Sequence, residues 1–499
     1  MTRRAARHKG RSRLDDRSPS TAVTLPDDFV TSAHVWLGDA AAAFLAACAR
    51  PPRLAMRANG LKGGLDALRR ALPPEAAEWP RVPWWPQALL PPTGEDTRLA
   101  ASTLARIGAL YAQDPAALAA VAALAPQPGE RVLDLCAAPG GKSTAIADRL
   151  RPTGLLVAND VDAGRARELG RTLERWGVTN SIVCALAPDR LAALAPRFFD
   201  AVLVDAPCSG EAMFARRDRA AADRSPEHVR GCSLRQQGLL HAARALVQPG
   251  GRIVYSTCTF NPIENEAVIA SYLAAHPHDA LDDAPAYVAA SSPGRPDLLP
   301  DDVRRPDLVR CARLWPHLTP GAGHVVARIR IAAAPAPSAA RQRGRPADRG
   351  RTPVDVDDAA VRAMVEPFAP GYIGGREISV GGDRAFLVPD GLPHALVAAA
   401  FAPGLELAER RGRTWRPAHA LAMALSPDGV GSTRALDDPA AALFLSGQPV
   451  DDPLRAEQSG IALVSWQGYP LGWGRSRGGI LAPLLPKGLL TPPHARHLA

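Results

Sequence analysis

The stretch RVLDLCAAPGGKSTAIADRL, residues 131–150, predicts the fold of the central part of this 499-residue chain. RVLDL is a short apolar β-like run, CAAPGG is a turn, and KSTAIADRL has a helical composition. A strand that leads through a glycine-rich turn into a helix N-terminus forms a site for a nucleotide-like ligand. LLVAND follows as a second strand and ends at Asp160, where an acidic residue commonly binds ribose hydroxyls.

The same turn ends in GKS, which also ends the P-loop of nucleotide triphosphatases. A P-loop requires glycine at the position that Cys136 occupies here, so the phosphate nest would be incomplete. A ligand without a triphosphate, S-adenosylmethionine, suits this turn better. The candidate cofactor-binding residues are therefore Asp160 and the loop residues Cys136, Ala137, Ala138, Pro139, Gly140, Gly141 and Lys142.

Two cysteines follow strand-like runs further along the chain, Cys208 after FDAVLVD and Cys258 after GRIVYST. In a doubly wound sheet, ligands lie at the carboxyl ends of the strands, and neighbouring strands are about 5 Å apart. If the two strands are neighbours, both thiols can reach one substrate atom beside the cofactor. Cys136 is expected to act through its backbone in the loop. The remaining cysteines are expected to be small buried apolar residues: Cys48, Cys184, Cys232 and Cys311.

The chain is long enough for about three domains. Composition separates a basic arm (1–22), an Ala- and Leu-rich region of expected helices (23–125), a block of alternating strands and helices (126–333), an Arg- and Pro-rich linker (334–353) and a mixed segment (354–499). The alternating block predicts an α/β fold with a Rossmann-like doubly wound sheet.

The net charge of +9 is concentrated in residues 1–13 and 341–351. Unstructured arginine there could contact phosphates, or the two segments could be a solubilising tail and a spacer, and charge alone leaves both open. Seven cysteines without CxxC or Cys/His spacing imply no disulfide framework and no metal site, which fits a reducing cytoplasm. No run approaches 18 apolar residues, so no membrane span is expected.

LDLCAAPGGK, DAPCSGEAMF and YSTCTFNPIENE resemble the motifs of the Nol/Nop/Sun family of RNA 5-methylcytosine methyltransferases. RANGLK (57–62) and YAQDP (111–115) are similar to the N-terminal motifs of that family. The tail resembles the RsmF-type branch, which methylates small-subunit (16S) ribosomal RNA. That resemblance implies an RNA-binding role for residues 23–125, an accessory domain at 354–430 and a PUA-like RNA-binding domain at 431–499.

The resemblance also implies the chemistry. Cys258 would add to cytosine C6, which activates C5 for methylation, and Cys208 would assist the elimination that releases the product. Asp205 would line the cofactor and base pocket, where burial could keep its carboxyl protonated so that it donates to the ring. Lys142 would position the cofactor or the target. The family's contact to the adenine side of the cofactor is not evident here, and Asp189 is the candidate substitute.

Two other functions stay open at this point: methylation of transfer RNA, and ribosome assembly by an RNA-binding factor without catalysis. DNA methylation is disfavoured, because those enzymes draw their nucleophile from the Pro-Cys motif. In the tail, Trp466, Tyr469 and Trp473 could stack on bases or fill a small β core, and the nearby Arg475 and Arg477 could pair with phosphates. The chain is expected to act as a monomer on ribosomal RNA.

Overall fold

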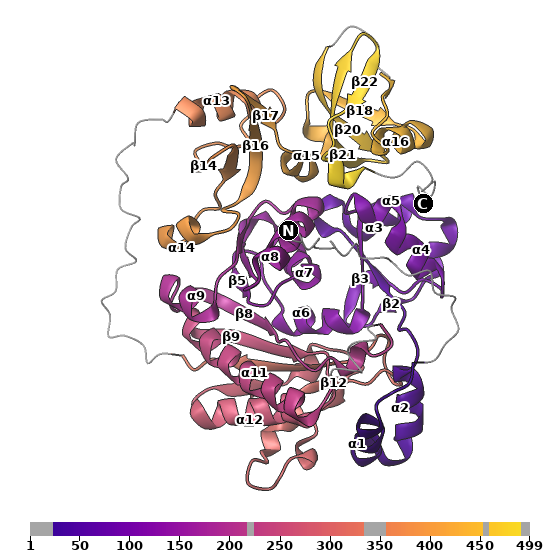
Figure 1. Ribbon diagram of the computed structural model, residues 1–499, viewed down its shortest axis with the longest axis vertical. Coiled ribbons are helices and arrows are strands. Elements are labelled where there is room, and N and C mark those ends of the chain that lie inside the picture. Colours follow the sequence, from indigo (N-terminus) through magenta and orange to yellow (C-terminus); the bar gives the residue numbers. More distant parts are fainter. Residues whose placement is uncertain (1–22, 217–223, 334–355, 453–458, 491–499) are drawn as a thin grey trace, which may run out of the picture.

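The computed structural model describes residues 23–216, 224–333, 356–452 and 459–490. Its largest sheet lies in the central block (Figure 1). Five strands of this sheet are parallel, in the order β9, β8, β5, β6, β7, and β10 to β13 extend it as antiparallel strands beyond β9. The strands are β5 (Arg131–Asp134), β6 (Leu155–Asn159), β7 (Ser181–Cys184), β8 (Phe199–Asp205), β9 (Val247–Thr257), β10 (Ala280–Asp282), β11 (Ser292–Pro293), β12 (Ala312–Leu314) and β13 (His324–Arg330).

Helices cover both faces of this sheet, because successive side chains of a strand point to opposite faces. Val132 packs toward one helical layer and its neighbour Leu133 toward the other. The first layer comprises α6 (Leu118–Leu124), α7 (Gly141–Leu150) and α8 (Ala163–Trp176). The second comprises α9 (Pro188–Leu194), α11 (Pro226–Leu246) and α12 (Glu266–Ala275). The Rossmann-like doubly wound fold is therefore confirmed.

Residues 23–125 contain the expected helices, and they also contain a sheet that the sequence did not predict. Four short strands form an antiparallel sheet in the order β2 (Arg81–Val82), β3 (Trp85–Leu89), β1 (Ala55–Ala58), β4 (Leu110–Gln113). The helices there are α1 (Asp27–Leu37), α2 (Ala41–Cys48), α3 (Gly64–Ala71), α4 (Glu95–Ala101) and α5 (Thr103–Arg106). Strands of two to five residues interrupted by proline carry too little alternation to be recognised from sequence.

Arg57 of β1 fastens this N-terminal sheet to the central α/β block. Its fully buried guanidinium pairs with Asp148 of α7, donates to Thr144 Oγ1 at 2.6 Å and lies 4.3 Å from the ring centroid of Trp176. A buried cation with these partners holds the N-terminal sheet in one position against the central block, because breaking such a pair leaves an uncompensated buried charge.

By length and composition, the stretch Asp27–Cys48 could cross a membrane. In the structure it is two helices, α1 and α2, joined at Gly38–Ala40, rather than one continuous span. Phe29 and Phe44 of these helices are fully buried in an aromatic cluster with Phe214, Phe260 and Trp315 of the central α/β block. Their apolar character is therefore explained by this packing.

Two further sheets follow in the C-terminal part (Figure 1). The first contains β14 (Ile378–Gly381), β15 (Arg384–Leu387), β16 (Leu405–Arg411) and β17 (Thr414–Pro417), with α13 (Val356–Val365), α14 (His394–Ala399) and α15 (His419–Ala424). The second has the order β18 (Thr433–Leu436), β20 (Gly460–Trp466), β21 (Tyr469–Arg477), β22 (Ile480–Pro483), β19 (Val450–Asp451), with α16 (Asp438–Leu445).

The three tail aromatics fill the core. Trp466, Tyr469 and Trp473 are 1–2% exposed, so they are not available to stack on bases. Trp466 and Tyr469 share a hydrophobic cluster with Met56 and Leu68 of the N-terminal region. Arg475 and Arg477 are exposed on β21, as their proposed role in phosphate binding requires, but that role stays a prediction.

A candidate methyltransferase site at the carboxyl ends of β5, β6, β8 and β9

The two motif cysteines meet at the carboxyl edge of the central sheet. β8 and β9 are parallel neighbours with Asp205 opposite Ser256, so Cys208 and Cys258 lie just beyond the ends of adjacent strands. Their Sγ atoms are 3.4 Å apart, and both side chains are partly exposed. The sequence-based expectation that the thiols lie together is confirmed. The expectation that the remaining cysteines are buried is also confirmed, for Cys48, Cys184, Cys232 and Cys311.

The two thiols lie in different electrostatic surroundings. A hydrogen bond to Cys258, burial and the negative charge on Cys258 raise the pKa of the Cys208 thiol well above its ordinary value. The Lys142 ammonium lies close enough to Cys258 for the two groups to interact electrostatically. The arrangement therefore favours Cys208 as a thiol.

Asp205 is charged in this structure, which corrects the expectation of a protonated carboxyl. Burial would raise its pKa, but the Lys142 ammonium and His324 lower that pKa far below its ordinary range. Lys142 Nζ donates to Asp205 Oδ2 at 2.7 Å, and Ser256 Oγ donates to Asp205 Oδ1 at 2.7 Å. Burial opposes the Lys142 ammonium as well, yet the adjacent carboxylate raises its pKa above the ordinary value. The two side chains form an ion pair directly beside the thiols.

A buried carboxylate holds the Cys208 turn in place. Glu264, fully buried in the turn after Cys258, accepts from Ser209 N at 2.9 Å and from Gln236 Nε2 at 2.9 Å. Gln236 also donates to the carbonyl of Pro207 at 3.1 Å. The residue before Cys208 and the residue after it are thus tied to the loop that carries Cys258, which fixes the distance between the thiols.

Glu264, Ser256 and His324 were not identified from the sequence. Glu264 lies inside the quoted motif FNPIENE, and Ser256 precedes Cys258 by two residues on the same strand face, so both had a local signal. His324 comes from β13, which pairs with β9, and its Nε2 lies 3.5 Å from Asp205 Oδ1. Its contribution depends on strand pairing across many residues and has no local sequence signal.

The glycine-rich loop joins β5 to α7 at the same edge. Gly140 has φ of +108°, and a Cβ there would lie 2.9 Å from Thr172 Cγ2, so a side chain would be strained and crowded. Arg165 of α8 donates to the carbonyl of Ala138 at 2.9 Å and pairs with Asp160 Oδ2 at 3.2 Å. The loop and the end of β6 are therefore held together by one guanidinium.

The donor set of this loop fits a cofactor with cationic and hydroxyl groups. Asp160 is 3% exposed at the end of β6, where the ribose contact was predicted. Asp134 at the end of β5 is fully buried, and its Oδ1 has no hydrogen-bond partner within the described residues. An unpartnered buried carboxylate oxygen beside the loop is where a donor group of a ligand would be stabilised. The described residues contain no group of three or more metal-ligating side chains.

Asp189, the candidate adenine contact, lies exposed in the first turn of α9. The segment after β7 is held by Asn159 instead. The Asn159 side chain accepts from Leu186 N and donates to Leu186 O, both at 3.0 Å. The role of Asp189 stays a prediction.

Comparison with known proteins agrees with this geometry. A family model described as 16S rRNA methyltransferase RsmB/F matches residues 121–330. Models of the N-terminal domain of 16S rRNA methyltransferase RsmF and of the RsmF PUA domain match residues 25–115 and 432–491. The crystal structure of a methyltransferase homologue from Pyrococcus horikoshii superposes with a TM-score of 0.52 at 28% identity, covering 61% of this chain and 94% of that one. The fold and the site thus define an S-adenosylmethionine-dependent rRNA methyltransferase.

The particular family follows from the curated relatives. Ribosomal RNA small subunit methyltransferase F of Escherichia coli O139:H28 is 30% identical over 484 residues, which cover 94% of this chain and 97% of that protein. The protein of that name from Klebsiella pneumoniae is 31% identical over 458 residues, 90% of this chain and 92% of its own length. The chain belongs to the ribosomal RNA small subunit methyltransferase F family.

Proposed function

We propose that this enzyme transfers a methyl group from S-adenosylmethionine to C5 of cytosine in 16S ribosomal RNA. The observation that carries the proposal is the pair of sulfur atoms 3.4 Å apart at the carboxyl edge of the sheet. A single nucleophile needs no second thiol at that distance. A covalent addition followed by an elimination gives each of them a role.

In this proposal Cys258 is the nucleophile. Its thiolate forms a bond to cytosine C6, and the electron pair displaced from the C5–C6 double bond makes C5 nucleophilic. The cofactor, held by the 136–142 loop and Asp160, supplies the electrophilic methyl group to C5. Lys142 and Asp205 lie beside the thiols as an ion pair 2.7 Å apart. The ammonium stabilises negative charge that develops on the ring, and the carboxylate orients the ammonium.

Cys208 assists the elimination. Negative charge on Cys258 contributes to the raised pKa of the Cys208 thiol in the free enzyme. Once the Cys258 sulfur is bonded to C6 it carries no charge, so this contribution to the pKa of Cys208 disappears. Cys208 is then a stronger acid than it is in the free enzyme. Cys208, which is partly exposed, can then lose its proton to solvent water and, as a thiolate, accept the C5 proton of the methylated ring. The electron pair of the C5–H bond re-forms the C5–C6 double bond, and Cys258 leaves as a thiolate.

Bisulfite sequencing of ribosomal and transfer RNA tests the substrate. Cells that lack the gene should lose one or a few 5-methylcytosines from 16S ribosomal RNA. Wild-type protein should restore them, whereas Cys258→Ala, as the matched control, should not. Loss of the modification from transfer RNA alone would contradict the proposed substrate. Unchanged maps of both RNAs, with subunit assembly impaired, would instead indicate an assembly factor without catalysis.

A further inference from the structure

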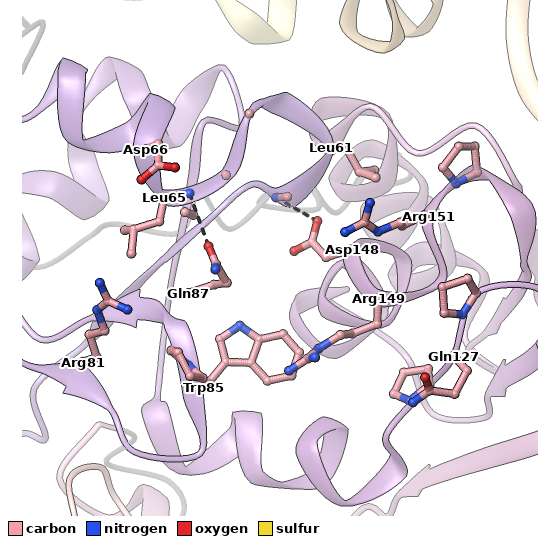
Figure 2. Close-up of a pocket in the computed structure, with 18 residues that line it drawn as sticks. Leu61, Leu65, Asp66, Arg81, Trp85, Gln87, Gln127, Asp148, Arg149 and Arg151 are labelled. Carbon is pink, nitrogen blue, oxygen red and sulfur yellow. Dashed lines mark hydrogen bonds between the residues drawn. The ribbon is translucent and has the colours of Figure 1, made fainter.

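A large hollow bordered by described residues lies away from the thiols. It has a volume of about 900 Å³ and is bordered by the N-terminal sheet on one side and by the end of α7 and the segment before β5 on the other (Figure 2). Among the lining residues, Pro126–Pro128 lie just before β5. Those between Asp148 and Pro152 lie at and just after the C-terminal end of α7, the end remote from the cofactor loop. With a rise of about 1.5 Å per residue, α7 places this groove about 15 Å from that loop.

Three arginines face the groove. Figure 2 shows Arg81 on one side, Arg151 on the other and Arg149 between them. All three are exposed, and within the described parts of the chain no carboxylate forms an ion pair with any of them. By contrast, the fully buried Arg57 nearby is paired with Asp148. Clustered cations without counter-charges repel each other and attract an anion.

The groove also has an aromatic floor with a free donor. Trp85 is 2% exposed, and the Arg149 guanidinium lies 4.6 Å from the centroid of its ring. The buried indole N–H of Trp85 has no partner among the described residues, whereas that of the adjacent Trp84 donates to Pro115 O at 2.9 Å. A buried donor without a partner is costly, so a ligand that accepts this hydrogen bond would be stabilised.

The acidic residues of the groove do not cancel its charge. Asp148 is already paired with Arg57 and accepts from Gly60 N at 3.1 Å, which leaves Asp66 as the other carboxylate that borders the hollow. Three cations therefore face one free carboxylate. The volume exceeds that of a single phosphate, and an arginine stacked on an aromatic ring presents a planar face suited to a nucleobase.

We infer that this groove binds a single-stranded segment of the substrate RNA, remote from the methylated cytosine, an inference that rests on the proposed function. Arg81 and Arg151 contact successive phosphates, and a base stacks on the Arg149 guanidinium above Trp85. The groove lies at the edge of the sheet opposite the thiols, so it anchors the RNA rather than the reacting base.

Binding of a fluorescently labelled 15-nucleotide oligouridylate tests the inference. The variant Arg81→Gln/Arg149→Gln/Arg151→Gln should bind about tenfold more weakly at 50 mM salt, and the slope of log K against log salt should fall by about 1.4, because two phosphate contacts are lost. The matched control Arg230→Gln/Arg304→Gln/Arg411→Gln removes the same charge from exposed sites elsewhere and should change both quantities little. Equal behaviour of the two triple variants would overturn the inference.

Photocrosslinking supplies an independent readout. An oligouridylate that contains 4-thiouridine should crosslink to peptides around Trp85 and Arg149, and the groove variant should lose that crosslink while still binding S-adenosylhomocysteine. Displacement of the oligonucleotide from the groove by millimolar inorganic phosphate alone would indicate a small-anion site and contradict the RNA assignment. The binding and crosslinking data do not depend on methyl transfer. If the wild-type enzyme methylates 16S ribosomal RNA and the groove variants bind like the control, only this inference fails.

Discussion

At the carboxyl edge of the central sheet, Asp205 is surrounded by Lys142, Ser256 and His324. The groove on the opposite side is different, because its three arginines have no ion-pair partner among the described residues: Arg81, Arg149 and Arg151. The first arrangement holds charges in fixed positions against each other. The second leaves charges available to an outside molecule. Pairing preorganises groups for chemistry, while unpaired surface cations supply affinity for a polyanion. We therefore propose the chemical step at one edge and the anchoring of RNA at the other.

Breaking the ion pair should have the largest effect on rate. Lys142→Gln keeps the side-chain length but removes the positive charge beside Asp205 and the two thiols, and we expect methyl transfer to slow by about 10²–10³-fold. Asp205→Asn should have a similar effect, because it leaves the ammonium without its partner. Single-turnover methylation of 16S ribosomal RNA measures this. A loss below threefold for both variants would mean that the pair only supports the structure.

Asp134, whose Oδ2 accepts from Ser143 Oγ but whose Oδ1 has no partner among the described residues, should affect stability according to pH. Burial raises the folded-state pKa of this carboxyl to about 7, well above its value in the unfolded chain. The folded state therefore holds a proton more tightly, and its free energy of unfolding falls as pH rises from about 4 to about 7. Asp134→Asn removes this dependence, so the variant should be more stable than the wild type at pH 8 by about 2–4 kcal/mol.

Urea unfolding at pH 4.5 and pH 8 checks this expectation. The stability gain of Asp134→Asn should nearly vanish at the lower pH, because the wild-type carboxyl is then protonated in the folded state. A gain of the same size at both pH values would contradict the titration of Asp134 as its cause.

The cofactor loop should respond more moderately. Asp160→Ala removes a carboxylate predicted to accept charge-assisted hydrogen bonds, so binding of S-adenosylhomocysteine should weaken by about 1.5–3 kcal/mol. Isothermal calorimetry measures this, with Asp189→Ala as the control for an exposed acidic residue on the neighbouring α9. Equal affinity of the Asp160 variant and the wild type would exclude Asp160 from the cofactor site.

The exposed pair on β21 should give the smallest effect. Arg475→Gln/Arg477→Gln should weaken RNA binding about threefold to tenfold and lower the salt slope by about 1.4, because two phosphate contacts are lost. A surface variant is preferable to a shortened chain, since Trp466 and Tyr469 share a hydrophobic cluster with Met56 and truncation would expose it. Filter binding at two salt concentrations decides between a contact and a solvated pair.

The sequence predicted those features that lie within one motif. The strand, turn and helix of residues 131–150 and the two thiols were found because each is encoded over a few consecutive residues. The charge state of Asp205 was not predicted, because it depends on Lys142 and His324, which come from distant elements. The N-terminal sheet was missed for the same reason. The burial of Trp473 was left open, also for that reason. Their short strands and glycines carry weak local signals, and tertiary packing decides them.

The most direct test of the central claim is the covalent adduct between protein and RNA. Purified Cys208→Ala, incubated with S-adenosylmethionine and 16S ribosomal RNA, should accumulate a complex that survives denaturing electrophoresis, because elimination is blocked after Cys258 has attacked. Cys258→Ala should give neither adduct nor product. The reverse pattern would make Cys208 the nucleophile, and an enzyme indifferent to both substitutions would contradict the covalent mechanism.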